Sequence, residues 1–392
     1  MINKKRLIKL TQNLIRIDSQ NPPGDESRIG KFVKNYLDNL GVKTKIYEFK
    51  KKRANVVAVL EGSNKKYSLL LTPHLDTVPA GKNWRFRPFK ATLHKGKIYG
   101  LGATDCKGNL ACGLEAINSL VEDDIVLDYN LIFAATADEE NGSGLGLIPL
   151  LNKGILKPDV AVVLDSDDFA IIVTQKGLIH LKINLQGIRA HGAYPWRGIN
   201  AIDIAIKILK ELKAKKFAYA KNKYLKGPTL NIGTIKGGDK VNIVADWCEF
   251  ELDIRFLPGM KELEILKEIR YIIQKHTRKF SPLISGIPLK AGKIEIEGIQ
   301  KPYKIEEAHT LVRSLIQAIK NIGQRPRIKG SEGATTITFF QNKKIPAVAT
   351  GFGSQGCAHS VDEYVKIDNL YKGAFVLEEF LKNYRSDKYG RN

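Results

Sequence analysis

Short apolar segments recur along this chain, and a histidine or a carboxylate follows most of them within a few residues. Their length, their content of Leu, Val, Ile and Ala, and the Gly, Asn or Pro that bounds them are typical of buried strands. The segments are 55–60, 67–71, 129–134, 159–164 and 347–350. Helical spacing at 109–121 and 144–152 alternates with them, so we expect the α/β class with a mostly parallel sheet. In such a sheet, ligands bind beyond the carboxyl ends of the strands.

Five side chains of the types that bind divalent metals stand at the ends of apolar segments. They are His74, Asp105, Glu140, Asp165 and His359. Two ions roughly 3.5–4 Å apart need one carboxylate to bridge them and further ligands on each ion. Three carboxylates and two histidines meet this need, and the nitrogen donors favour zinc or cobalt over magnesium or calcium. The sequence therefore predicts a site for two divalent metal ions, Zn or Co.

Two domains are expected, because 392 residues exceed the usual size of a single hydrophobic core. After residue 176 the pattern changes to strand, helix, strand, strand, helix and strand. These elements are predicted at 178–185, 201–212, 229–235, 248–256, 262–276 and 293–297. The order βαββαβ is that of a ferredoxin-like fold. We therefore expect a catalytic domain formed by 1–176 and 299–392, split by an inserted domain at 177–298 in which 279–291 form a loop.

Composition and charge argue against several classes of protein. No run of eighteen apolar residues exists, and residues 1–17 mix Lys and Arg with Leu and Ile, so neither a membrane span nor a signal peptide is expected. Four scattered cysteines suit a reduced, cytoplasmic compartment better than a disulfide framework. The formal net charge of +22 raises the hypothesis of nucleic-acid binding. No aromatic platform or nucleic-acid motif accompanies the basic clusters, so we expect a solvated surface and no nucleic-acid partner.

Three sequence motifs carry a resemblance to a known family. Residues 72–79 are Thr-Pro-His-Leu-Asp-Thr-Val-Pro, residues 100–108 are Gly-Leu-Gly-Ala-Thr-Asp-Cys-Lys-Gly, and residues 137–144 are Ala-Asp-Glu-Glu-Asn-Gly-Ser-Gly. With these motifs the chain resembles the dinuclear-zinc metallopeptidase and deacylase family. That family includes acetylornithine deacetylase, succinyl-diaminopimelate desuccinylase, aminoacylase and the glutamate-releasing carboxypeptidases. The resemblance covers essentially the whole chain, including the inserted domain.

The resemblance implies a role for each residue of the metal site. The metal ligands would be His74, Asp105, Glu140, Asp165 and His359, with Asp105 as the bridging carboxylate. Asp76 would orient the imidazole of His74. Glu139 would be the general base, which takes a proton from a water shared by the metals and returns it to the departing amine. The resulting hydroxide would attack the amide carbonyl.

The inserted domain also contains residues that match the family. His191 resembles a lid histidine that reaches the active site of a partner subunit and stabilises the developing oxyanion. Asn242 and Arg255 resemble the residues that hold the substrate carboxylate, for which the forked guanidinium of arginine is suited. The resemblance therefore implies a homodimer that acts on a small N-acyl amino acid or dipeptide.

Structural roles for the same residues remain as alternatives. Glu139 and Glu140 could form an exposed acidic turn, because like charges normally avoid burial. Asp165 could cap a helix, and His191 could pack within a turn. Arg255 could pair with a carboxylate on the surface of its strand.

One departure from the family concerns the substrate pocket. Near 330–336 many deacylase relatives have an acidic residue where this chain has Thr336, which leaves the acyl group and the amine open. The expected function is a metal-dependent amidohydrolase of amino-acid biosynthesis that removes an acyl group from an N-acyl amino acid. A dipeptidase or carboxypeptidase with the same metals is the nearest alternative. A non-catalytic binding protein on the same fold is an alternative of another class.

Overall fold

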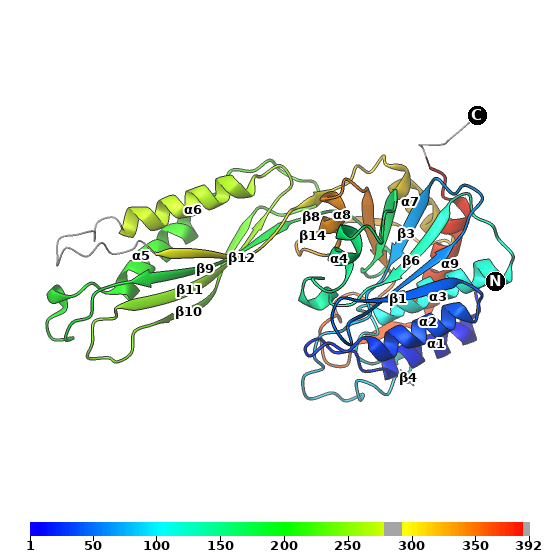
Figure 1. Ribbon diagram of the computed structural model, residues 1–392, viewed down its shortest axis with the longest axis horizontal. Helices are drawn as coiled ribbons and strands as arrows, with labels where there is room; N and C mark the ends of the chain where they lie inside the picture. The colour runs from blue at the N-terminus through cyan, green and yellow to red at the C-terminus, as the bar shows by residue number, and fades with distance from the viewer. Residues whose placement is uncertain (278–291, 387–392) are drawn as a thin grey trace. The chain divides into compact units, whose positions relative to one another are not determined.

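The structure, a computed structural model, describes residues 1–277 and 292–386. The chain forms two compact units, and Figure 1 labels many of their elements. The first unit consists of Met1–Val173, Ile305–Lys329 and the residues from Phe339 onward. The second consists of Thr174–Lys304 together with Gly330–Thr338. The loop predicted at 279–291 lies outside the described residues.

A mixed sheet holds the buried strands of the first unit. Its strands lie side by side in the order β1 (Lys43–Glu48), β2 (Ala54–Leu60), β6 (Asn130–Ala135), β3 (Ser68–Thr72), β7 (Val160–Leu164), β15 (Ala347–Gly351) and β8 (Ala170–Gln175). The central pairs β6–β3, β3–β7 and β7–β15 are parallel, whereas the outer pairs are antiparallel. β7 and β15 are buried at every residue, as expected of central strands whose sequence is almost continuously apolar. The predicted α/β class with a mostly parallel sheet is confirmed, with antiparallel strands at its margins.

Helices pack around this sheet. They are α1 (Lys4–Arg16), α2 (Ser27–Asp38), α3 (Lys107–Glu122), α4 (Leu147–Asn152), α7 (Thr310–Asn321) and α9 (Ile367–Asn383). α1, α3, α9 and α7 contact one another in that order, while α3 contacts β7 and α7 contacts β15. α3 is buried from Lys107 to Leu120, so it is the centre of this helical layer. Because it begins two residues after Asp105, its burial also fixes the loop that carries that residue.

Shorter elements complete the description. A three-stranded antiparallel sheet consists of β4 (Thr92–His94), β5 (Lys97–Tyr99) and β16 (Tyr364–Lys366). The others are β13 (Tyr303–Lys304), β14 (Arg327–Ser331), α8 (Ile337–Gln341) and the 3-10 helices η1 (Glu139–Asn141) and η2 (Pro195–Arg197). The pairing of β16 with β5 brings the segment that follows His359 beside the segment that precedes Asp105. Among the described helices, none has the length and apolar character needed to cross a membrane.

The second unit is an antiparallel sheet with two helices. Its elements follow one another as β9 (Gly177–Gln186), α5 (Ala201–Ala214), β10 (Thr229–Gly237), β11 (Trp247–Phe256), α6 (Glu262–Thr277) and β12 (Lys293–Gln300). The strands lie in the order β10-β11-β9-β12. This arrangement confirms the predicted ferredoxin-like order βαββαβ.

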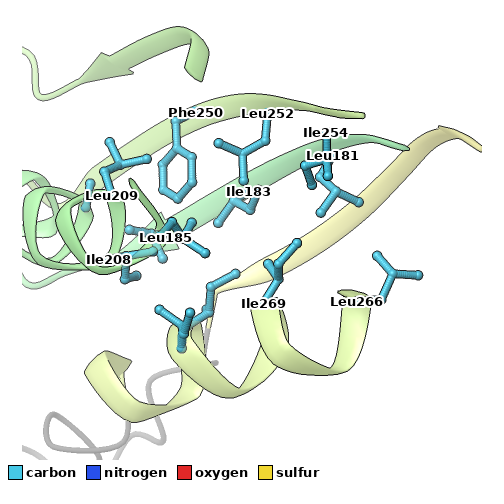
Figure 2. Packing of buried hydrophobic residues seen from close by; sticks show 14 of the residues in the cluster. Leu181, Ile183, Leu185, Ile208, Leu209, Phe250, Leu252, Ile254, Leu266 and Ile269 are labelled. Carbon is cyan, nitrogen blue, oxygen red and sulfur yellow. The ribbon is translucent and has the colours of Figure 1, made fainter. Parts of the chain in front are cut away.

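One face of this second sheet forms the core of the unit. β11 alternates between buried and more exposed residues, which is typical of an antiparallel strand that is covered on one side. Figure 2 shows apolar side chains of both helices pointing toward that face. Those labelled are Ile208 and Leu209 of α5, Leu266 and Ile269 of α6, Leu181, Ile183 and Leu185 of β9, and Phe250, Leu252 and Ile254 of β11.

Candidate metal centre and catalytic site

The predicted metal ligands follow neighbouring elements of the first unit. His74 comes two residues after β3, Asp165 directly after β7, and Glu140 lies in η1, which follows β6. His359 lies in the loop after β15, and Asp105 precedes α3. Because β6, β3, β7 and β15 are adjacent and parallel, their carboxyl ends meet at one edge of the sheet. The five side chains come together at that edge.

Two overlapping groups of donor atoms form there, and Asp105 belongs to both. One group contains His74, Asp105 and Asp165, and the other contains Asp105, Glu140 and His359. Within each group the donor atoms lie within 4.8 Å of one another. One carboxylate oxygen of Asp105 lies 2.9 Å from Nε2 of His74, and the other lies 3.2 Å from Nε2 of His359. A carboxylate shared by two such groups has the arrangement that a bridging ligand of two ions requires.

The charges of this cluster are poorly balanced by the protein alone. Burial raises the pKa of Glu139 well above its usual value, and the carboxylate of Asp165 adds to this effect. Burial also raises the pKa of Asp165 to about 7, with a further contribution from Asp105. Oε1 of Glu140 is buried and has no hydrogen-bond partner among the described residues. Cations relieve the repulsion between buried carboxylates, and they can coordinate an oxygen that accepts no hydrogen bond. The donor set therefore fits two divalent ions.

The two histidines differ in exposure and therefore mark the two sides of the cluster. The side chain of His74 is 2% exposed, whereas that of His359 is 53% exposed. Hydrogen bonds to Asp105 and Glu140 raise the pKa of His359 to about 10. Burial opposes ionisation of Asp105, but its hydrogen bonds with His359 and His74 hold its pKa below the usual value. The cluster is thus open to solvent on the side of His359.

Asp76 connects the histidine to the acidic turn. Nδ1 of His74 lies 3.0 Å from the main-chain oxygen of Asp76 and 3.7 Å from its carboxylate. The two carboxylate oxygens of Asp76 accept the N–H groups of Glu139 and Glu140, at 3.0 Å and 3.2 Å. Asp76 therefore contacts the imidazole through its backbone and holds the two glutamates through its side chain.

Glu363 is a buried residue of the site that the sequence analysis did not identify. It is 1% exposed, and its carboxylate accepts the N–H groups of Gly102, Thr104 and Asp105 at 2.8, 2.7 and 3.0 Å. Burial raises the pKa of Glu363 to about 7. Its place four residues after His359 was the only available signal, and nothing in the sequence connects it to the loop of Asp105.

His191 and Asn242 lie beside each other in the second unit. His191 forms a β-bridge with Ile243, and the N–H of Gly192 donates to the carbonyl of Asn242 at 2.8 Å. Both predicted side chains are exposed. Nδ1 of His191 accepts the N–H of Ala193 at 3.0 Å, so Nε2 is the nitrogen available to a ligand.

Arg255 lies at the opposite end of β11 from Asn242. Its guanidinium donates two hydrogen bonds to the carboxylate of Asp253, from Nε at 2.7 Å and from Nη2 at 2.8 Å. From Trp247, the first residue of β11, the strand runs eight residues to Arg255, which corresponds to about 26 Å. The structure thus places Arg255 apart from His191 and Asn242 and pairs it with a carboxylate of its own strand.

Comparisons with known proteins agree with this arrangement. Residues 70–383 match the sequence profile of Peptidase family M20/M25/M40. An uncharacterised metallohydrolase of Methanocaldococcus jannaschii is 30% identical, with 96% of this chain and 98% of that protein covered. The acetylornithine deacetylase of Pasteurella multocida is 29% identical, with 90% of each protein covered. Among solved structures, a tripeptidase of Staphylococcus aureus has a TM-score of 0.80 at 26% identity, with 97% of this chain and 98% of that chain covered.

Proposed function

The chain belongs to Peptidase family M20/M25/M40, and from this premise we propose that it removes the acyl group from an N-acyl amino acid. As a member of this family it is a metallohydrolase of amide bonds. The observation that carries the proposal is the pair of donor groups that share Asp105, with Glu139 among their electrostatic neighbours. The similarity to acetylornithine deacetylase supports the choice of an N-acyl amino acid as the substrate.

We assign the two donor groups to two divalent ions. His74 and Asp165 would hold one ion, Glu140 and His359 the other, and Asp105 both. The two imidazole nitrogens favour zinc or cobalt over an ion that prefers oxygen ligands only. When bound, the ions polarise the amide carbonyl and lower the pKa of a water molecule.

Glu139 is the residue that moves the proton. Burial raises its pKa, so the carboxyl group can keep a proton that it has taken from water. It then returns this proton to the nitrogen of the departing amine. The hydrogen bond from its N–H to Asp76 fixes the start of the side chain relative to the strand end that carries His74.

The second unit would supply the groups that bind the substrate. Nε2 of His191 is an available donor for the oxyanion, and Asn242 and Arg255 are donors for a carboxylate. About 26 Å of strand separates the two ends of β11, so His191 and Asn242 of one chain do not meet the same small ligand as its Arg255. This separation supports a homodimer, in which one subunit contributes His191 and Asn242 to the site of the other.

A second candidate is a dipeptidase, tripeptidase or carboxypeptidase that uses the same metal centre. The fold of the Staphylococcus aureus tripeptidase, which matches along nearly the whole chain, favours it. So does Thr336, which is 5% exposed and provides no charge where many deacylase relatives have an acidic residue. A non-catalytic binding protein is disfavoured, because both donor groups and Glu139 are intact.

A substrate panel with controlled metal content tests the proposal. The protein is stripped with a chelator, reloaded with zinc or cobalt, and assayed on N-acetyl and N-succinyl amino acids, dipeptides and tripeptides. We expect no turnover without metal, restored turnover with zinc or cobalt, and a larger kcat/KM for N-acyl amino acids than for peptides. Full activity of the stripped protein would refute the metal mechanism, and a preference for peptides would establish the second candidate. Metal binding without hydrolysis of any compound would indicate a binding protein.

We also propose that the protein acts in the cytoplasm and binds no nucleic acid. Its four cysteines are free and buried, in keeping with a reducing compartment. Many basic side chains take part in ion pairs with neighbouring carboxylates, such as Lys182 with Glu249 and Lys275 with Glu211. Steeply salt-dependent binding to single or double strands would contradict this part of the proposal.

A further inference from the structure

A buried ion pair lies behind the turn that carries Glu139. Arg53 is 5% exposed and Glu26 is 0% exposed, and they form two parallel hydrogen bonds of 2.7 Å. Burial raises the pKa of Glu26, and the guanidinium of Arg53 opposes this effect. A third hydrogen bond runs from Nη2 of Arg53 to the carboxylate of Asp138, at 2.9 Å. The arginine therefore connects the start of α2 to the residue that precedes Glu139.

Asp138 has a backbone conformation that needs support. Its φ of 65° lies in the left-handed region, which is unfavourable for a residue with a side chain. Three donors hold its carboxylate: Nη2 of Arg53, Nδ2 of Asn21 at 3.2 Å, and the N–H of Leu145 at 2.9 Å. These contacts stabilise the left-handed turn from which η1 begins.

Asn21 joins this turn to Asp76. Its amide nitrogen donates to Asp138 and also to Asp76, the latter at 2.9 Å. Asp76 in turn accepts the N–H groups of Glu139 and Glu140. A continuous chain of buried and partly buried hydrogen bonds thus leads from Arg53 to the backbone of both glutamates.

Stability alone does not account for so many buried charges. Two carboxylates, those of Glu26 and Asp138, contact one guanidinium, and Asn21 links Asp138 to a third, that of Asp76. The cost of desolvating these charges offsets much of the attraction to Arg53. Apolar side chains of the same volume commonly stabilise a core as well as a buried ion pair does. The part of the network that runs through Asp138, Asn21 and Asp76 ends on the turn of Glu139 and Glu140, and it orients that turn.

We propose that Arg53 and Asn21 are positioning residues that orient Glu139 for proton transfer and Glu140 for metal binding. This inference rests on the proposed function, because it assigns the two glutamates the roles given there. Arg53 acts through Asp138 and Asn21 acts through both Asp138 and Asp76. Neither contacts the donor groups directly. Outer residues of this kind commonly change metal affinity or activity by about 10–100-fold when they are replaced.

Two substitutions in the network and one matched control test the inference. Arg53→Lys keeps the positive charge but cannot make the two parallel hydrogen bonds to Glu26. Asn21→Ala removes the link between the carboxylates of Asp138 and Asp76 and leaves the ion pair of Arg53 and Glu26. The control is Arg6→Lys, because Arg6 makes two hydrogen bonds of 2.8 Å to Glu115, a fully buried carboxylate outside the site. For each variant, kcat, KM, zinc affinity and Tm are measured on the full-length protein.

We expect Arg53→Lys and Asn21→Ala to lower kcat about 10–100-fold and to weaken zinc binding about tenfold or more. KM should stay within about twofold, because the substrate is held by other groups. Arg6→Lys should lower Tm by about as much as Arg53→Lys does, and it should leave kcat and zinc affinity unchanged. The inference is overturned if both network variants keep the kcat and zinc affinity of the wild type, or lose them only as far as Arg6→Lys does.

Two further results separate this inference from the proposed function. If Arg53→Lys does not fold, Asn21→Ala alone decides, because it leaves the arginine in place. If the metal-loaded wild type hydrolyses nothing on the panel, the proposed function fails. In that case, weakened zinc binding by the variants would support the proposal that the network positions Glu140. Unchanged zinc binding would overturn it.

Discussion

His359 contacts only one of the two carboxylate oxygens of Glu140. Nε2 of His359 lies 3.1 Å from one oxygen of Glu140, while the other oxygen is buried and finds no hydrogen-bond partner within 1–277 and 292–386. A buried acceptor with no donor destabilises the folded protein until a ligand completes it. A bound cation would satisfy this oxygen, so metal binding and the stability of the site would be coupled.

The affinity for zinc should rise with pH. In the metal-free protein the pKa of His359 is about 10 and that of Asp165 about 7, so both groups carry protons in mildly acidic solution. Zinc must displace these protons, and fewer remain on Asp165 as the pH passes its pKa. Calorimetric titrations between about pH 6 and pH 8 should show tighter binding and less proton release at the higher pH. The variant His359→Gln is the control, because it removes the proton of His359 and leaves Asp165 to titrate. A zinc affinity of the wild type that does not change with pH would contradict the ligand assignment.

Glu139→Gln should remove turnover while the metals stay bound. The amide cannot accept the proton that Glu139 is proposed to transfer, so kcat should fall by about 10²–10⁴. Metal content by mass spectrometry should match that of the wild type, because Glu139 belongs to neither donor group. Glu122→Gln, on the partly exposed end of α3, serves as the control. A variant at position 139 with the activity of the wild type would reject the proposed base.

Glu363→Ala should destabilise the protein and disturb Asp105. The substitution leaves two buried N–H groups and one partly buried N–H group without an acceptor, which should cost on the order of 2–4 kcal/mol. Urea unfolding with and without zinc measures this loss, together with the zinc affinity. Glu363→Gln should have a smaller effect, because its amide oxygen still accepts. Equal unfolding curves for the alanine variant and the wild type would show that this carboxylate does not hold the loop.

Mixing two inactive variants tests whether each active site contains residues of both subunits. Glu139→Ala lacks the base and His191→Ala lacks the lid histidine, so each homodimer should be nearly inactive. A hybrid dimer would contain one complete site, built from His191 of the first variant and Glu139 of the second. After random exchange of subunits, activity should recover to about one quarter of the wild type, since half of the dimers are hybrids with one working site of two. No recovery, with exchange verified by mass spectrometry, would place both residues of a working site on one chain.

The strands of the first unit could be predicted because their apolar runs identify them without reference to the rest of the fold. The run at 159–164 corresponds to β7, and the run at 347–350 to β15. The antiparallel orientation of the outer strands of the sheet could not be predicted from these apolar runs. β2 pairs with β6 in antiparallel orientation, and an apolar run has the same appearance in either orientation.

The donor groups could be predicted because strand ends in an open α/β sheet converge. Glu363 and Arg53 could not, because a buried acid or a buried arginine has no local pattern. Each is recognisable only from its partners, Asp105 for Glu363 and Asp138 for Arg53, which are distant in sequence.

The sequence by itself indicated the α/β class and the βαββαβ unit, because both follow from local composition and spacing. Its motifs indicated the family through resemblance, and its strand ends indicated which donor side chains lie together. Tertiary structure alone decided that the carboxylate of Glu363 accepts the N–H of Asp105, and that the guanidinium of Arg53 donates to Asp138. The physical reason is that hydrogen bonds and charge pairs depend on distances of a few ångströms between residues remote in the chain. Only the packed fold sets those distances.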